Sequence, residues 1–164
     1  MKSRKLALAG ILCALAILGS FFSIPVLGSK VAPVQHIVNV LGAVMLGPWY
    51  ALGIAFASSL LRNLLGIGTL MAFPGSMFGA FLAGLGYKYG KKLTFALVGE
   101  VFGTSVLGGL CAYPIAILFL GKTAGELAFY AYILPFFFST FTGALIAGAF
   151  IYALRGRGIL NKFN

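Results

Sequence analysis

Residues 39–53, N-V-L-G-A-V-M-L-G-P-W-Y-A-L-G, decide the fold because they lie inside the longest charge-free interval of the chain, residues 31–61. Proline fits the first turn of a helix but not its middle, so Gly47-Pro48 predicts a tight turn and the start of a new helix. Without this break, the charge-free intervals predict five membrane-spanning helices of about 20 residues or more. With the break, they predict six.

Composition places the whole chain in a membrane. Of the 164 residues, 61% are hydrophobic and 9% are charged, whereas a soluble domain carries about 25% charged residues. The apolar run that follows M-K-S-R-K resembles a signal peptide, but no clear cleavage site ends it and further spans follow, so we expect it to be retained. The sequence therefore predicts a single multi-pass domain, residues 1–164, in the cell membrane.

The positive charges favour six spans over five. Most of the 12 basic residues lie at the ends of the chain and between the apolar stretches, which is typical of topology signals and not of a nucleic-acid site. Six spans with both termini in the cytoplasm put three basic clusters on the side that is normally richer in Lys and Arg: Lys2, Arg4 and Lys5; Lys88, Lys91 and Lys92; Arg155, Arg157 and Lys162. The prediction is an all-α bundle with helices at about 5–25, 34–46, 48–65, 73–89, 93–120 and 127–154.

The predicted helix 34–46 is too short to cross a bilayer. It would rise about 20 Å, less than the ~30 Å thickness of the hydrocarbon core. A short segment interrupted by Gly and Pro is tolerated at membrane depth when it is buried in protein or lines a cavity, and in transporters such segments lie near binding sites. We therefore expect a cavity around the outer end of this helix.

Polar and aromatic side chains gather at the outer ends of the predicted helices. A pocket with aromatic walls and a few hydrogen-bonding groups suits a small neutral heterocycle. The candidate ligand-binding residues are His36, Asn39, Arg62, Asn63, Tyr113 and Tyr130. Other interpretations stay open: Arg62 can extend to the lipid headgroups, Tyr130 can belong to an interfacial aromatic belt, and His36 with Asn39 can link helices by hydrogen bonds.

Glu100 stands apart from these residues in the sequence. It lies about two turns beyond the basic pair Lys91-Lys92, near the cytoplasmic end of the predicted helix 93–120. An isolated carboxylate at membrane depth should be paired or protonated. Arg155 is the candidate partner, and we expect Glu100 to serve coupling on the inner side instead of ligand binding.

The sequence contains neither a catalytic set nor an ATP-binding loop. Residues 116–123, A-I-L-F-L-G-K-T, satisfy a loose Walker A pattern, but they end a membrane helix instead of joining a strand to a helix. An intramembrane hydrolase that uses Ser76 and His36 is the alternative from another class, and it lacks an acid and an oxyanion loop. Cys13 and Cys111 show no metal-ligand spacing, so we expect free thiols and neither a metal nor a cofactor.

Two long runs resemble the ThiW family: N-V-L-G-A-V-M-L-G-P-W-Y-A-L-G (39–53) and S-L-L-R-N-L-L-G-I-G-T-L-M-A-F-P-G-S-M-F-G-A (59–80). ThiW proteins are substrate-binding S components of energy-coupling factor (ECF) transporters. The resemblance implies uptake of the thiamine precursor hydroxyethylthiazole, with thiamine, its pyrimidine precursor or another vitamin as alternative substrates. It also implies a transmembrane coupling subunit and two cytoplasmic ATPases as partners, so that this chain needs no ATPase site of its own.

The resemblance further implies a docking face on the first helix. S components of this class commonly contact the coupling subunit through small residues spaced four apart on that helix. In this chain Ala9-xxx-Cys13 and Gly10-xxx-Ala14 offer such a face, although neither is the strict alanine pair. We expect Ala9, Gly10, Cys13 and Ala14 to form the coupling face.

Overall fold

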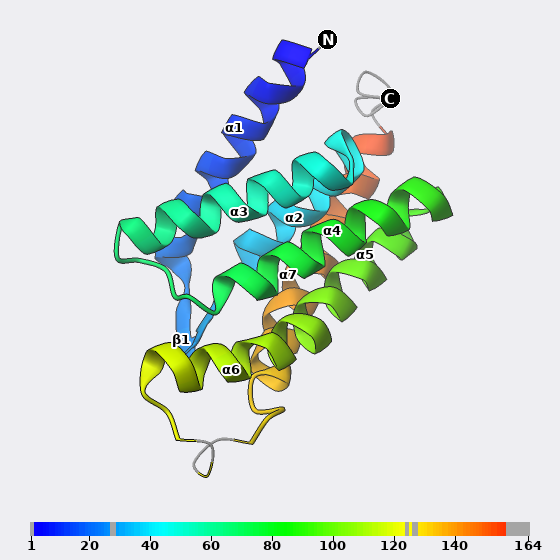
Figure 1. Cartoon of the computed structure of the whole chain (residues 1–164). Coiled ribbons are helices and arrows are strands. Elements are labelled where there is room, and N and C mark those ends of the chain that lie inside the picture. The colour runs from blue at the N-terminus through cyan, green and yellow to red at the C-terminus, as the bar shows by residue number, and fades with distance from the viewer. Residues whose placement is uncertain (1, 27–28, 124, 126–127, 157–164) are drawn as a thin grey trace.

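The computed structural model describes residues 2–26, 29–123, 125 and 128–156. The described residues form a helical bundle with one short β-hairpin (Figure 1). In chain order the elements are α1 (Lys2–Gly19), the 3-10 turn η1 (Ser20–Phe22), β1 (Ile24–Val26), β2 (Ser29–Val31), α2 (Pro33–Leu46), α3 (Pro48–Leu64), α4 (Ala72–Gly90), α5 (Leu93–Phe102), the π-helical stretch η2 (Gly103–Gly108), α6 (Gly109–Leu120) and α7 (Ile133–Gly156).

In the part of the chain that the structure describes, three helical stretches are long and apolar enough to cross a membrane, namely Lys2–Phe22, Leu93–Leu120 and Ile133–Gly156. The shorter α2, Pro33–Leu46, is also apolar. With the composition of the chain, this identifies an α-helical membrane protein.

The chain turns sharply between α2 and α3, where the sequence predicted a break. α2 ends at Leu46, Gly47 has φ = 91°, and α3 begins at Pro48. Glycine adopts this left-handed backbone conformation without the steric cost of a side chain, and Pro48 occupies the first turn, where its missing N–H is tolerated. A Cβ atom on Gly84 of α4 would lie 2.8 Å from the ring nitrogen of Pro48, so Gly84 allows α4 to approach this turn closely.

The largest differences from the predicted helix bounds are at the end of α1 and the start of α7. The α-helix expected to reach residue 25 ends at Gly19, and β1 pairs antiparallel with β2, Ile24 opposite Val31. Pro25 lies in β1, and proline disfavours helical backbone at the residue before it. The last helix begins at Ile133 instead of near residue 127, with Pro135 in its first turn, where proline is tolerated.

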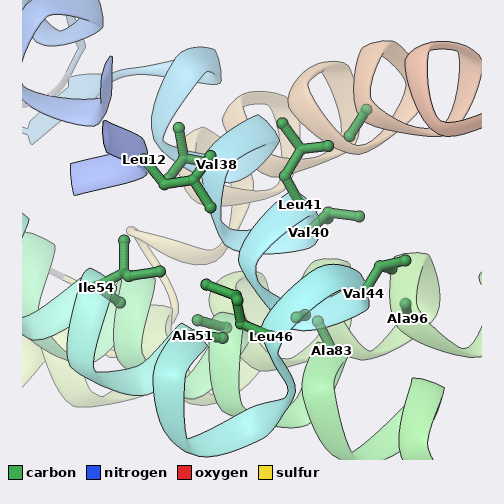
Figure 2. Close-up of a cluster of buried hydrophobic side chains, with 14 of the residues drawn as sticks. Leu12, Val38, Val40, Leu41, Val44, Leu46, Ala51, Ile54, Ala83 and Ala96 are labelled. Carbon is green, nitrogen blue, oxygen red and sulfur yellow. The ribbon is translucent and has the colours of Figure 1, made fainter. Parts of the chain in front are cut away.

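The short helix α2 lies at the centre of the bundle. It contacts α1, α3, α4, α5 and α7, and apolar side chains leave it in several directions. Figure 2 shows Val38, Val40, Leu41 and Val44 of α2 among side chains from the surrounding helices. This arrangement satisfies the physical requirement for a helix too short to span the bilayer, because protein surrounds it on several sides.

The helix predicted over residues 93–120 contains a π-helical segment in its middle, η2. Gly103 and Gly108 mark its ends, and a Cβ atom on Gly103 would lie 2.7 Å from the backbone oxygen of Phe78 on α4. The missing side chains let η2 and α4 meet backbone to backbone. π-Helical turns are frequent at functional sites, and this one directly follows α5, which carries Glu100.

The helix ends fall into two groups at opposite ends of the bundle (Figure 1). The start of α1, the α2–α3 turn, the α4–α5 turn and the end of α7 lie toward one end, and the two strands, the α3–α4 loop, the end of α6 and the start of α7 lie toward the other. Arg155 Nη2 donates a hydrogen bond of 3.0 Å to Tyr87 Oη, which ties the end of α7 to that of α4.

Candidate functional site

A cluster of polar side chains is buried where α2, α3, α4, α5, η2 and α7 meet. Each member is at most 6% exposed. Polar groups at membrane depth normally face a cavity or each other, and both occur in this cluster. Its members are Gln35, His36, Asn39, Ser58, Ser59, Arg62, Ser76, Glu100, Thr104, Ser139 and Thr140.

Glu100 lies at the centre of this cluster. Its Oε1 lies 2.8 Å from His36 Nδ1, accepts a hydrogen bond of 2.9 Å from Asn39 Nδ2 and a longer one of 3.4 Å from Thr104 Oγ1. The expectation that Glu100 pairs with Arg155 on the inner side is wrong, because Arg155 is exposed and contacts Tyr87. The contacts with α2 bridge 61 and 64 residues of sequence, a separation that no local pattern reveals.

The second carboxylate oxygen of Glu100 is buried against α4. Among the described residues Glu100 Oε2 has no hydrogen-bond partner, and a Cβ atom on Gly79 would lie 2.9 Å from it. The same Cβ atom would overlap Thr104 Oγ1. Gly79 therefore provides the space in which Glu100 and Thr104 pack against α4.

Arg62 joins the cluster from the last turn of α3. It is 2% exposed, and its Nη1 donates a hydrogen bond of 2.7 Å to Gln35 Oε1. Gln35 Nε2 in turn donates to Asn39 Oδ1 at 3.4 Å, so a continuous chain of hydrogen bonds runs from Arg62 through Gln35 and Asn39 to Glu100. The interpretation that Arg62 extends to the lipid headgroups is wrong, because the side chain is buried inside the protein.

A small cavity opens beside this hydrogen-bonded chain. Its volume is about 40 Å³, enough for roughly three waters at ~10–15 Å³ each and below the ~300 Å³ at which ligand pockets begin. The wall combines charged, polar and apolar groups from α2, α3, α4, η2 and α7. The lining residues are Ala32, Gln35, His36, Arg62, Thr69, Met71, Ala72, Gly75, Ser76, Thr104, Phe136 and Ser139.

Of the six candidate residues, His36 and Arg62 line this cavity. Asn39 is buried outside the lining and holds Glu100 and the backbone oxygen of Ser76. Asn63 donates to the backbone oxygens of Ser59 and Thr69 at 2.8 and 3.1 Å, so it fastens the end of α3 to the loop before α4.

Tyr113 and Tyr130 also lie outside this cavity lining. Tyr113 is half-buried on α6, and Tyr130 is 58% exposed, with its ring edge-on to Phe129. Their role in ligand binding stays a prediction. Sequence reasoning did not select Thr104, Phe136 and Ser139 of the lining, because η2 and α7 carry no polar pattern that distinguishes these positions. Gln35 could have been selected, since it precedes His36 in the same turn of α2.

The positions of Ser76, His36 and Glu100 test the hydrolase alternative. The structure supplies the acid that the sequence appeared to lack, since Glu100 contacts His36. Ser76 Oγ, however, donates to the backbone oxygen of Ala72 at 2.7 Å and lies 2.9 Å from Ser59 Oγ. A serine nucleophile needs a hydrogen bond to its base, and in the part of the chain that the structure describes Ser76 and His36 form none.

A separate, largely apolar groove runs between α1 and α3. Ala9, Gly10 and Cys13 from the predicted coupling face line it, together with Trp49, Tyr50, Gly53 and Ala57 among others. Ala14 is exposed outside this lining. Small residues on both helices make the hollow, and Trp49, 71% exposed, lies at its side.

A helical bundle with apolar outer faces and a buried cavity lined by polar and apolar side chains is typical of a membrane protein that binds a small molecule. The sequence profile of the ThiW family, described as thiamine-precursor transporter protein, matches residues 6–157. The chain belongs to the ThiW family, and this membership assigns it to the transport of thiamine precursors. A search of curated proteins found no match.

Proposed function

We propose that this chain is the substrate-binding S component of an ECF-type importer and that hydroxyethylthiazole binds in the cavity beside His36 and Arg62. The observation that carries the proposal is the buried network from Arg62 to Glu100, which holds polar groups at the wall of a cavity inside an apolar bundle. Buried polar groups of this kind are costly unless they are satisfied. In a transporter such groups can hydrogen-bond a heterocyclic ligand, and the family membership supports this role.

The cavity lining contains hydrogen-bonding groups for the polar atoms of the ligand and apolar side chains for its ring. His36 Nδ1 is occupied by Glu100, which leaves Nε2 as the ring nitrogen that can serve the ligand. Arg62 carries only donors, which suit the ring nitrogen or hydroxyl oxygen of a thiazole. Phe136 and Met71 supply apolar surface for the ring and its methyl group. Asn39 and Glu100 act as positioning residues behind this surface.

Binding enlarges the cavity. Its 40 Å³ is less than a substituted thiazole occupies, so side chains of the wall must move when the ligand enters. Thr69, Met71 and Ala72 lie in or directly after the α3–α4 loop and line the cavity. A shift of Met71 and Ala72 is the simplest way to make room, because it leaves the hydrogen bonds of Ile67 and Gly68 to Arg62 and those of α2 to Glu100 intact.

Six spans with both termini in the cytoplasm complete the proposed arrangement. The alternating grouping of helix ends supports it (Figure 1), and Lys88, Lys91, Lys92 and Arg155 lie at the ends of α4 and α7, which the Arg155–Tyr87 contact joins. This basic end would face the cytoplasm, and the cavity would open from outside. The α1–α3 groove would receive a helix of the coupling subunit, whose ATPase partners supply the energy.

Calorimetric titration of the purified, detergent-solubilised chain tests the substrate. We expect hydroxyethylthiazole to bind more tightly than thiamine or hydroxymethylpyrimidine, and His36→Ala to weaken that binding. Preference for one of the other two compounds would keep the S-component assignment and change the substrate. Absence of binding to folded protein, together with hydrolysis of an ester that is lost in Ser76→Ala, would replace the transport proposal by the hydrolase alternative.

A further inference from the structure

We propose that Arg62 makes the cavity selective for an uncharged thiazole over a quaternary thiazolium, so that the protein accepts the precursor ring and rejects finished thiamine. Thiamine carries its thiazole ring as a permanent cation, because the ring nitrogen is alkylated. The inference rests on the proposed function and names the property of the ligand that the cavity distinguishes.

The guanidinium of Arg62 is fixed in the cavity wall. Its Nη1 is bound to Gln35, and its backbone oxygen accepts hydrogen bonds from the amides of Ile67 and Gly68 at 3.0 and 2.9 Å. Gly68 packs so closely that a Cβ atom there would lie 3.0 Å from Arg62 Cβ. The loop after α3 therefore holds the backbone and Cβ of Arg62, and Gln35 holds its guanidinium in the cavity wall.

No carboxylate balances this charge at the cavity surface, as far as the described residues show. Glu100 is absent from the lining. Its Oε1 is occupied by His36 and Asn39, and its Oε2 is buried beside Gly79. Glu126, the other acidic residue of the chain, lies outside the described residues. His36 brings no negative charge to this wall, and Arg62 presents its positive charge to a ligand.

Two effects then act in the same direction. An uncharged thiazole offers a lone pair on its ring nitrogen, which a guanidinium can contact as donor, whereas a thiazolium has lost this lone pair. A thiazolium also brings a second positive charge within a few ångströms of Arg62 in a partly desolvated site. At an effective dielectric constant near 20, like-charge repulsion lowers affinity by roughly 1,000-fold at about 4 Å and still by ~10-fold at about 12 Å.

Two ligands that differ by one methyl group test the selectivity. Calorimetry on the full chain in detergent compares hydroxyethylthiazole with its N-methylated thiazolium. We expect the neutral ring to bind at least ~10-fold more tightly. Equal or tighter binding of the thiazolium, with the neutral ring still bound, would overturn the inference and leave the proposed function intact. If neither compound binds to folded protein, the proposed function fails together with the inference.

Variants then assign the effect to Arg62. Arg62→Lys keeps the positive charge and should keep the preference, whereas Arg62→Gln should reduce it to within about threefold of equal binding, because little repulsion remains. Arg155→Gln removes a cation far from the cavity and should leave the wild-type ratio unchanged. An unchanged preference in Arg62→Gln would overturn the assignment, and the comparison on the wild-type chain stands even if this variant does not fold.

Discussion

Arg62 and Arg155 both lie in the last turn of a helix, yet they occupy opposite environments. Arg62 is 2% exposed and hydrogen-bonded to Gln35 in the central cluster, whereas Arg155 is exposed and contacts Tyr87 at the basic end of the bundle. Both are basic residues at the edge of an apolar stretch, so the local sequence does not separate them. The difference comes from tertiary packing: α2 lies beside the end of α3 and supplies Gln35, whereas Arg155 meets the half-buried Tyr87.

Removing a charged side chain should lower the free energy of unfolding far more in the central cluster than at the basic end of the bundle. Glu100→Ala removes the acceptor shared by His36 and Asn39 and leaves both side chains buried without it, so we expect a loss of about 3–5 kcal/mol in the free energy of unfolding. Arg155→Ala in the exposed region should change it by less than about 0.5 kcal/mol. Titration with a denaturing detergent measures both variants. Similar losses for the two would contradict the central position given to Glu100.

The close approach of α4 to α5 and η2 gives the next largest expected effect. Gly79→Ala places a methyl group against Glu100 Oε2 and Thr104 Oγ1, and overpacking of this kind costs about 1–3 kcal/mol. Gly53→Ala on α3 is the matched control, because nothing lies within 4 Å of the added atom. Thermal unfolding of the two variants in detergent should separate them. Equal stability would show that α4 is free to move away from Glu100.

Asn63 should affect stability by a smaller amount. Its side chain donates to two backbone oxygens, those of Ser59 and Thr69, and the net value of such hydrogen bonds is about 0.5–1.5 kcal/mol each. We expect Asn63→Ala to lower the unfolding free energy by about 1–2 kcal/mol in total, because two bonds are lost and water at the half-buried site replaces part of them. If Asn63 instead contacts the ligand, as its position beside Arg62 suggested, the variant would lose affinity in calorimetry while its stability stays at the wild-type level.

The smallest effect on the isolated chain should come from the α1–α3 groove. Gly10→Leu adds bulk where a Cβ atom meets nothing within 4 Å, so ligand affinity should stay unchanged and the unfolding free energy should move by less than about 0.5 kcal/mol. Co-purification with the coupling subunit should be lost. Ala14 was also predicted on the coupling face but is exposed outside the groove, so Ala14→Leu distinguishes the two surfaces of α1 and should leave co-purification intact. Loss of assembly in Ala14→Leu alone would place the coupling face on the other side of α1.

The sequence was most informative where backbone chemistry acts locally. Gly47-Pro48 predicted the turn between α2 and α3, since glycine permits the left-handed conformation and proline starts a helix. Composition predicted a helical membrane protein for similarly direct reasons. His36 and Arg62 could be selected because polar residues inside apolar helices are costly and need a partner or a cavity.

The pairing of helices could not be predicted in this way. Glu100 lies closer in sequence to Lys91 and Lys92 than to any polar residue of α2, so local reasoning placed it at the inner end. It reaches His36 because α5 packs beside α2 in the centre of the bundle. Phe136 and Ser139 joined the cavity for the same reason: α7 approaches α2 there, as Gly143 shows by packing against the backbone of Pro33. Such contacts depend on the whole arrangement of helices.

The most direct test of the central claim is whether the ligand protects the cavity from chemical labelling. Cys13 and Cys111 are the two native cysteines, so a chain with both changed to alanine can carry single reporters. Ala72→Cys lies in the cavity lining, and Ala57→Cys, equally half-buried, lies in the α1–α3 groove. Hydroxyethylthiazole should slow labelling of Ala72→Cys by a small methanethiosulfonate and leave Ala57→Cys unaffected. Protection of Ala57→Cys alone, or of neither in a chain that still binds the ligand, would contradict the account.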